Sequence, residues 1–561
     1  MGTISVASER LPIRVVIATA ICVTLLMVAW TLAWQSGNLS FGHGDAQTSM
    51  VTTGQGPVHG GPYLTDIPGK PRAGVYFEGR RLVAGYAGPS ARYRRSCDGA
   101  VMDVGFMVGS DNLDLAALDA WRTRAPCNIY TRLSLVQVYD QDEKRPPLAA
   151  ADRAGEAGTD PRRDWAGRLG SLQQGARSAT VAFSGEDGAF SALLALQVMA
   201  GVERSSLWSL VDLQGREAAL YTGGGTGPAY RSGRLATPDT DTRWLRDPQV
   251  ALRSNPTVIG WTSSADTRSF FARGRVASRR GRFASTPMAS FRIGVGGPSP
   301  VGSWARFGVV LWQAPLDPAE MEAAIAQVNR AMAFPVHFDA MAVMRGDSIL
   351  YGAGAEGFDQ RGPGWFLAQA MPTVELFDLG MKAQLLAHQI GPDFDAVVAP
   401  LLATSPYGPS RTAILWQSGT NDIGRAGRSA AQLIADSAAA VRQSRAALPG
   451  VHVLRSTLLP RDDAGWAVSK TSDGMSKEDA RQAVNAAWRG GASGADRVID
   501  IADPRSTMGA PRAPGDTAPR TAAGVPIPAS LYADRLHPSS VGYASGLWQG
   551  FAEGLRAQRG Q

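Results

Sequence analysis

Three short polar strings in this chain carry side chains that could together perform acyl transfer. Ser348 ends the run "AVMRGDS", Asn421 lies in the run "AILWQSGTND", and His537 lies in "DRLHP" near the C-terminus. A serine hydroxyl becomes an effective nucleophile when a neutral imidazole accepts its proton. Asp534 precedes His537 closely enough to accept a hydrogen bond from the other ring nitrogen and fix its tautomer. These residue types therefore predict a serine, a histidine and an aspartate that act on an acyl group.

The same strings offer donors for the oxyanion that forms during acyl transfer, which needs hydrogen bonds fixed in advance. The donors are the side-chain amide of Asn421 and the backbone N–H of Ser348. An ordinary turn is the alternative, because Gly346, Asp347 and Ser348 are all residues that turns prefer. In either case, Asp347 is expected to hold backbone N–H groups of its own loop.

The chain after residue 334 has the pattern of an α/β domain. The predicted strands are continuous apolar runs such as "DAVVAPLLA", "TAILWQ" and "VHVLRSTLL", and helical stretches such as "AAQLIADSAAAVRQSRAAL" lie between them. This alternation is typical of a parallel sheet that is covered on both faces. Ligands bind at the carboxyl ends of such strands, so Ser348 and Asn421 are expected to converge. We therefore predict an α/β domain over residues 335–561.

Residues 74–334 have a different pattern, in which short apolar runs are separated by turn-forming residues. Runs such as "RLSLVQVYD", "SATVAFSG", "PTVIGWTSS" and "ARFGVVLWQ" predict many short strands, and hence a β-sandwich or jelly roll. Asp317 and Pro318 then begin a stretch whose apolar residues recur at helical spacing. This stretch predicts a helix that closes the domain.

The N-terminal region is predicted to anchor the chain in a membrane. Residues 15–34 carry no charge and are long enough to span a bilayer as a helix. Arg10 and Arg14 precede them, which places residues 1–14 in the cytoplasm and the rest outside, in the periplasm if the cell is Gram-negative. A cleaved signal peptide is the alternative. Residues 35–73 are rich in Gly, Ser, Thr and Pro and are predicted to form a flexible linker.

The composition argues against several classes of function. The net charge is +7, but the chain has no Lys/Arg block or nucleic-acid-binding motif, so we expect no nucleic-acid partner. The 6 histidines are dispersed and no Cys/His zinc spacing exists, so we expect neither a metal nor another cofactor. Cys97 and Cys127 lie beyond the predicted anchor, where a disulfide can form. The alternative is that these two cysteines are not bonded and are buried as small apolar side chains.

The order of the strings, with GDS first, G-x-N-D second and D-x-x-H-P last, resembles that of SGNH/GDSL hydrolases over about residues 336–558. The resemblance implies a three-layer α/β fold with a parallel sheet. It also implies Ser348 as the nucleophile, His537 as the general base and Asp534 as the residue that orients it. The backbone N–H of Ser348 and the amide of Asn421 would then serve the oxyanion hole.

One motif departs from the family pattern. The family carries a string like N-x-G-x-x-G after the second strand, and its counterpart here is "FDLGMKAQ". Gly380 matches the first glycine, whereas Ala383 stands where the glycine of the oxyanion hole is expected. An alanine can also donate its backbone N–H if its φ and ψ permit, so Ala383 is the candidate third donor. Gly380, Gly419 and Asp347 are the expected supporting residues. Impaired catalysis is an alternative consequence of the departure.

A second resemblance covers about residues 82–141. The strings "AGYAGPSARYRRSCDG", "LDLAALDAW" and Tyr139-Asp140-Gln141 follow one another as in the catalytic domain of family 54 α-L-arabinofuranosidases. This implies a concanavalin/LamG-like jelly roll. The chain departs from the family after Gln141, and the two carboxylates of a retaining glycosidase cannot be placed. A binding or scaffold role is therefore favoured over glycosidase activity. The candidate aromatic contacts for a sugar are Trp208, Tyr221, Tyr230 and Trp261, and a position in the core is the equal alternative for each of them.

Together these features predict a membrane-anchored, extracytoplasmic serine esterase of the SGNH type. Its expected substrate and partner is an acylated carbohydrate, for instance an O-acetylated exported polysaccharide, and this expectation rests on the pairing of domains. One alternative is a carbohydrate O-acyltransferase that uses the same triad. The others are a non-catalytic polysaccharide-binding protein and an arabinofuranosidase-like glycosidase.

Overall fold

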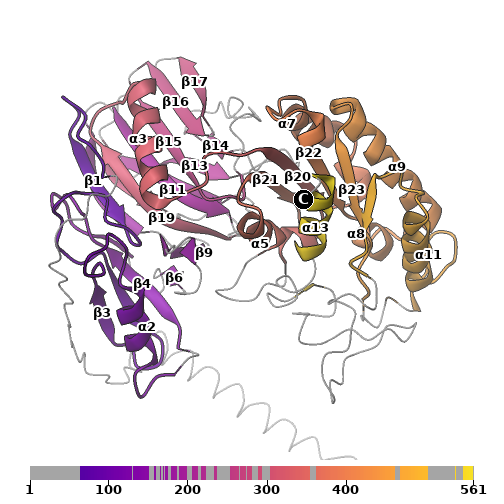
Figure 1. Ribbon diagram of the computed structural model, residues 1–561, viewed down its shortest axis with the longest axis horizontal. Coiled ribbons are helices and arrows are strands. Elements are labelled where there is room, and N and C mark those ends of the chain that lie inside the picture. The colour runs from indigo at the N-terminus through magenta and orange to yellow at the C-terminus, as the bar shows by residue number, and fades with distance from the viewer. Residues whose placement is uncertain are drawn as a thin grey trace, which may run out of the picture. The chain divides into compact units, whose positions relative to one another are not determined.

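The computed structural model describes most of residues 63–150, a series of strands within residues 157–236, most of residues 253–353 and 362–502, and residues 537–538 and 548–559 (Figure 1). The predicted anchor at residues 15–34 and the predicted triad residue Asp534 lie outside these ranges. Among the described residues, no helix is both long enough and apolar enough to cross a bilayer.

The C-terminal part of the described chain contains a five-stranded sheet in which every neighbouring pair of strands is parallel. The strands, in spatial order, are β21 (Val374–Gly380), β20 (Ala340–Gly346), β22 (Thr412–Gln417), β23 (His452–Ser456) and β24 (Arg497–Ile499). The parallel sheet predicted from the apolar runs after residue 334 is therefore confirmed.

Helices cover both faces of this sheet. Along β20, Ala342 and Met344 belong to one buried cluster, whereas Met341 and Val343 belong to another. Strand side chains alternate between the two faces, so the two clusters lie on opposite sides of the sheet. The first cluster includes α5 (Pro363–Ala370) and α13 (Trp548–Gln558); the second includes α7 (Ala399–Ala403), α9 (Ala430–Ala447) and α11 (Lys477–Arg489). This part of the chain is a three-layer α/β arrangement.

One apolar run that was predicted as a strand is helical. In "DAVVAPLLA", the π-helix η5 (Phe394–Val398) leads directly into α7. Four residues of this run are buried: Val397, Val398, Leu401 and Leu402. They recur at the spacing of one helix face. A short apolar run does not by itself distinguish a buried helix from a buried strand. Here the run is helical, and its second helix, α7, packs against α9.

The N-terminal part of the described chain forms two larger antiparallel sheets. One contains β1 (Arg72–Phe77), β19 (Ser303–Trp312), β11 (Phe190–Val198), β15 (Thr257–Ser263), β16 (Thr267–Ala272) and β17 (Arg275–Arg280) in that order, with β9 (Ser171–Gln174) also paired to β19. The other contains β14 (Gly233–Ala236), β13 (Glu217–Thr222), β12 (Ser205–Asp212), β18 (Met288–Ile293), β10 (Ala179–Gly185), β5 (Leu148–Ala150), β4 (Leu133–Val138), β2 (Ala91–Arg95) and β3 (Val101–Val104), with β6 (Ala157–Thr159) paired to β4. A short hairpin joins β7 (Asp164–Trp165) and β8 (Arg168–Leu169).

These two sheets share one buried cluster. Along β11, Leu194 packs in the same cluster as Tyr93 of the second sheet, whereas Leu193 belongs to the cluster on the opposite face. The helix α3 (Pro318–Met332) covers that opposite face over β15, and it begins as predicted with Asp317 as its N-cap (Figure 1). Trp261 lies in the shared cluster with 2% of its surface exposed, so of its two alternatives the core position is confirmed and the sugar contact is wrong.

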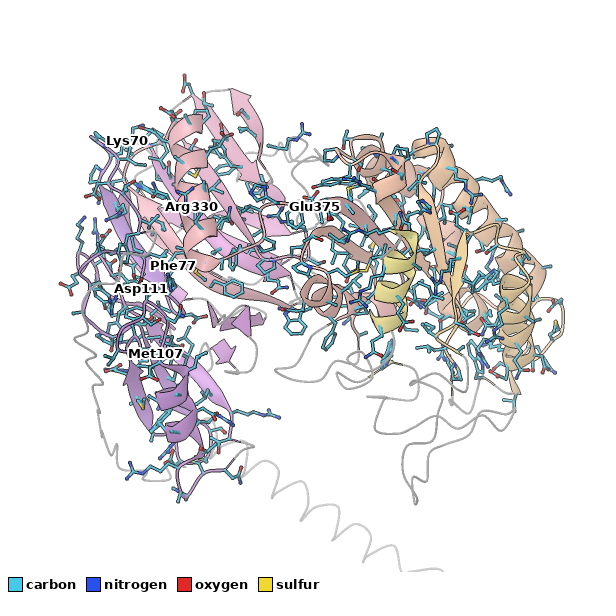
Figure 2. All side chains as sticks on the ribbon, in the orientation of Figure 1. Lys70, Phe77, Met107, Asp111, Arg330 and Glu375 are labelled. Carbon is cyan, nitrogen blue, oxygen red and sulfur yellow. A yellow bond between two sulfur atoms is a disulfide. The ribbon has the colours of Figure 1, made fainter. Side chains whose placement is uncertain are left out.

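The packed region begins before residue 74, within the range predicted as a linker. Leu64 is buried, and the Nζ of Lys70 (labelled in Figure 2) lies 2.8 Å from the carboxylate of Glu320 on α3. The guanidinium of Arg72 forms an ion pair at 2.9 Å with Asp142. Composition alone predicted a flexible segment here because the partners of these residues lie far away in the sequence.

The Tyr139-Asp140-Gln141 string of the second resemblance fixes a turn. The carboxylate of Asp140 accepts a hydrogen bond from the backbone N–H of Val75 at 2.8 Å. The side-chain oxygen of Gln141 accepts one from the backbone N–H of Leu82 at 2.6 Å. Both receiving side chains are buried. These motif residues therefore tie the end of β4 to β1 and its following loop.

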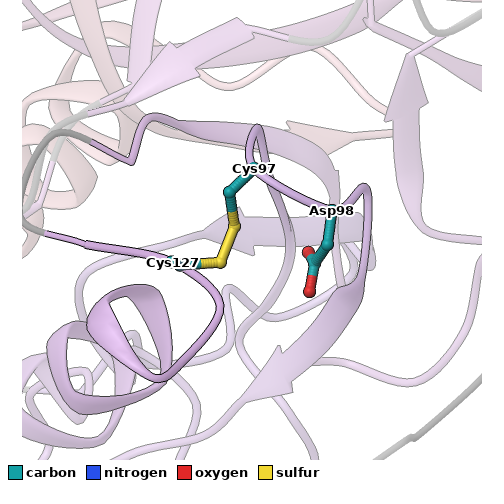
Figure 3. Close-up of side chains that lie close together, drawn as sticks. All are labelled: Cys97, Asp98 and Cys127. Carbon is teal, nitrogen blue, oxygen red and sulfur yellow. A yellow bond between two sulfur atoms is a disulfide. The ribbon is translucent and has the colours of Figure 1, made fainter.

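Cys97 and Cys127 are joined by a disulfide, with their Cα atoms 5.6 Å apart (Figure 3). The carboxylate of the neighbouring Asp98 accepts three hydrogen bonds from Arg95, at 2.9, 3.1 and 2.7 Å. Because the two sulfurs are bonded to each other and Asp98 is paired, these three residues do not offer a set of metal ligands.

The edge strand β21 of the parallel sheet is covered by residues that precede β15. The N–H of Ser254 donates to the carbonyl of Leu376 at 2.8 Å, and the Oδ1 of Asn255 accepts the N–H of Leu376 at 2.9 Å. Arg253 forms a buried ion pair at 3.5 Å with Glu375 on β21 (labelled in Figure 2). These bonds satisfy backbone groups that an open sheet edge would expose.

Candidate active site

Ser348 and His537 are brought together in the α/β region. Ser348 begins the short helix α4 (Ser348–Tyr351), which follows β20 directly. The Nε2 of His537 lies 2.9 Å from the Oγ of Ser348. Ser348 is buried, with 8% of its surface exposed, and His537 is half-buried. The distance is that of a hydrogen bond between a nucleophile and its base.

The sequence around Ser348 explains how the strand turns into the helix. The carboxylate of Asp347 accepts the N–H of Ile349 at 3.0 Å, as an N-cap does, and the backbone N–H of Asp347 donates to the carbonyl of Gln417 at 3.0 Å. A Cβ on Gly346 would lie 2.4 Å from the carbonyl oxygen of Gln417, so only glycine fits there. Gly346 and Asp347 thus form the turn that their types favour, and this turn presents Ser348.

Asn421 lies at the same edge of the sheet. It belongs to α8 (Thr420–Gly424), which follows β22, and β22 is the parallel neighbour of β20 with Gln417 in register with Gly346. Gly419 has a φ of 125°, a conformation that favours glycine. The Nδ2 of Asn421 donates to the carbonyl of Gln384 at 3.2 Å. This nitrogen carries two hydrogens, so the second is available to an oxyanion.

The segment after β21 carries the alanine that departs from the family pattern. A Cβ on Gly380 would lie 2.5 Å from the backbone nitrogen of Tyr351, which explains the glycine at the strand end. Asp378 accepts the N–H of Gly380 at 2.9 Å and so holds the backbone at the strand end. Ala383 has a φ of 59°, in the left-handed region. The alanine therefore adopts a backbone conformation that glycine adopts more readily.

Three charged groups are buried beneath these loops. Burial raises the pKa of the Asp347 carboxyl to about 7, and the negative charge of Asp422 contributes to this shift. Burial likewise raises the pKa of Asp422, and it lowers the pKa of Arg455 to about 9. The guanidinium of Arg455 lies 3.9 Å from the ring centre of Trp488. Sequence reasoning placed Asp422 only within the G-x-N-D string and did not single out Arg455, although an arginine within the apolar run "VHVLRS" signals a buried charge.

Comparison with known proteins identifies the α/β region. The GDSL-like Lipase/Acylhydrolase family matches residues 345–544, a segment that contains Ser348, Asn421 and His537. No curated protein matches the chain.

Several solved structures resemble parts of the chain. A GH54 α-L-arabinofuranosidase soaked with a cyclic sulfate inhibitor is 13% identical with a TM-score of 0.36, over 47% of this chain and 63% of that one, which is less than two thirds of its length. A carbohydrate esterase family 2 enzyme plus carbohydrate binding domain from Corynascus thermopiles (Myceliophthora fergusii) is 14% identical with a TM-score of 0.28, over 70% and 96%. A family two carbohydrate esterase from Clostridium thermocellum in complex with cellohexaose is 10% identical with a TM-score of 0.29, over 70% and 95%. These scores are too low for us to infer fold or function from them.

The family match and the parallel sheet agree on one assignment. The matched segment starts at the end of β20, where GDS lies, and it includes the segment that carries His537. Residues 345–544 of this chain therefore belong to the GDSL-like lipase/acylhydrolase family, and the chain carries an esterase domain.

Proposed function

We propose that this protein is a serine esterase in which Ser348, His537 and Asp534 form the catalytic triad. The observation that carries this proposal is the 2.9 Å contact between the Ser348 hydroxyl and the His537 imidazole. Ser348 attacks the ester carbonyl while Nε2 takes the hydroxyl proton and then passes it to the leaving alcohol. Water, deprotonated by the same nitrogen, then attacks the acyl carbon, and Nε2 returns the proton to the Ser348 oxygen as the acyl group leaves as a carboxylic acid. Asp534 orients the imidazole and stabilises its charged form.

The proposed oxyanion hole consists of the backbone N–H groups of Ser348 and Ala383 and the side-chain amide of Asn421. These donors would stabilise the charge that develops on the carbonyl oxygen during attack. The left-handed backbone at Ala383 supports this assignment, because the alanine adopts the conformation that a glycine would. It also argues against the alternative that the alanine has abolished catalysis.

The proposed substrate is an acyl ester on a carbohydrate, such as an O-acetylated polysaccharide outside the cytoplasm. The esterase domain shares its chain with an antiparallel β region whose motifs resemble those of arabinofuranosidases. Residues 15–34 are proposed to anchor the protein in the membrane, with residues 1–14 in the cytoplasm.

The test uses the full-length protein in detergent with nitrophenyl acetate, a long-chain nitrophenyl ester and an acetylated polysaccharide. Free acid is measured for the wild type, for Ser348→Ala and for Ser472→Ala, a control at an exposed serine on a separate loop. We expect acetate release by the wild type and the control only, with polysaccharide preferred over the long-chain ester. Hydrolysis that survives Ser348→Ala would overturn the mechanism, and preference for the long-chain ester would overturn the substrate class.

A further inference from the structure

Residues 381–386, called here the oxyanion loop, contain a backbone conformation that their sequence does not favour. Ala383 has a φ of 59°, and a non-glycine residue rarely adopts this region because its Cβ crowds the backbone. An alanine released from its surroundings would relax to a negative φ. The relaxation would turn the peptide N–H of Ala383 in another direction. Something outside the loop must therefore hold it.

The helix α8 and its C-cap residue supply that restraint through three contacts, to Ala383, Gln384 and Leu386. The Nη1 of Arg425, the C-cap of α8, donates to the carbonyl of Ala383 at 3.2 Å. The Nδ2 of Asn421 donates to the carbonyl of Gln384 at 3.2 Å. The Oδ2 of Asp422 accepts the N–H of Leu386 at 2.8 Å. A run of backbone groups in the loop is thus bound by side chains of one short helix.

The other side of the oxyanion loop is attached to the segment that carries the nucleophile. The N–H of Met381 donates to the carbonyl of Gly346 at 3.0 Å. The Nζ of Lys382 lies 5.0 Å from the ring centre of Tyr351, on α4. The loop therefore joins the Ser348 turn to α8, and its conformation depends on both.

We propose that Arg425 and Asp422 are positioning residues of the oxyanion hole, which hold Ala383 in the left-handed conformation so that its N–H can serve the oxyanion. This inference rests on the proposed esterase function. Asp422 is completely buried and supports the loop from within, whereas Arg425 is exposed and bonds to Ala383 itself. A glycine at position 383 would adopt the same φ without crowding, so the need for Arg425 follows from the alanine.

The experiment is a double-mutant cycle between Arg425→Ala and Ala383→Gly in the full-length protein. In the wild-type background, Arg425→Ala should lower kcat about three- to tenfold, the effect of one lost hydrogen bond, with KM nearly unchanged because the donor acts in the transition state. In the Ala383→Gly background, the same change should lower kcat less than about twofold. Arg425→Lys should restore part of the loss. Arg445→Ala, which breaks a half-exposed ion pair with Asp496, should leave kcat unchanged.

A second measurement follows the oxyanion loop without relying on catalysis. Hydrogen exchange of a peptide that covers residues 382–387 should be faster in Arg425→Ala than in the wild type and in Arg445→Ala. An equal fold-loss in kcat in both backgrounds would overturn the proposal, as would unchanged exchange in Arg425→Ala. Failure of the esterase mechanism has a different signature, which is activity that survives Ser348→Ala.

Discussion

The Nε2 of His537 lies within 2.9 Å of the Oγ of Ser348, although 189 positions separate the two residues in the chain. Ser348 stands at the carboxyl end of the first strand of the parallel sheet, and His537 comes after its last described strand. The two side chains therefore meet although they come from the beginning and the end of the α/β region. A change to either residue should remove the same chemical step, because members of a triad act as a unit.

Removal of the Asn421 amide should slow turnover without preventing acylation. Asn421→Ala should reduce kcat about 10²- to 10³-fold, the usual effect of one lost oxyanion donor. A reactive phosphonate should still label Ser348 in this variant because the nucleophile and its base remain. Steady-state kinetics together with labelling test this prediction. A fall in kcat of less than about threefold would exclude Asn421 as a donor to the oxyanion.

The burial of Asp347 predicts how stability depends on pH. Its pKa rises from the ordinary value of 3.8 to about 7 in the folded protein. Between these two pH values the carboxyl is therefore protonated in the folded state and ionised in the unfolded state. The contribution of Asp347 to the free energy of unfolding therefore falls as pH rises through this window. Asp347→Asn keeps an oxygen for the N–H of Ile349 and removes the titration.

Urea unfolding of the wild type and of Asp347→Asn, from about pH 4 to about pH 8, measures this effect directly. The variant should gain stability relative to the wild type as pH rises, and the difference between their unfolding free energies should level off above about pH 7. A difference that stays constant across the range would show that Asp347 remains ionised in the folded protein.

The disulfide should stabilise the β-rich region. Cys97 and Cys127 are separated by 30 positions, and closing a loop of that size contributes about 3 to 4 kcal/mol in the chain-entropy model. Replacement of both cysteines by serine should lower the unfolding free energy of this region by about that amount, and a reducing agent should have the same effect on the wild type. Denaturant unfolding followed by tryptophan fluorescence would show it. Indifference of the wild type to the reducing agent would contradict the prediction.

The proposed anchor predicts where the protein fractionates. With residues 15–34 in the bilayer, the full-length chain should stay in the membrane fraction after a carbonate wash. Arginines introduced at Leu25 and Leu26, near the centre of this segment, should release it, because charge at the bilayer centre is costly. A mature N-terminus near residue 34 would instead indicate a cleaved signal peptide.

The convergence of Ser348 and Asn421 could be predicted from the sequence for a physical reason. Both follow continuous apolar runs, and the carboxyl ends of parallel strands share one edge of the sheet. The strand predicted at "DAVVAPLLA" was wrong because that prediction also relied on a continuous apolar run. A short apolar run fits a buried helix as well as a buried strand.

Other features depend on contacts that no local pattern encodes. The left-handed φ of Ala383 is set by Arg425 and its neighbours on α8, which lie about 40 positions further along the chain. The packing of Lys70 likewise depends on Glu320, 250 positions away, so a Gly- and Pro-rich composition wrongly suggested that the linker extends through this residue.

Labelling with a serine-directed fluorophosphonate tests the central claim most directly. The reagent is applied to the full-length wild type, to Ser348→Ala and to His537→Ala, and the modified peptide is identified by mass spectrometry. We predict one adduct in the wild type, on Ser348, with no adduct in Ser348→Ala and strongly slowed labelling in His537→Ala, because the hydroxyl is a weak nucleophile without its base. An adduct on another residue, or labelling of Ser348 at the wild-type rate without His537, would contradict the mechanism.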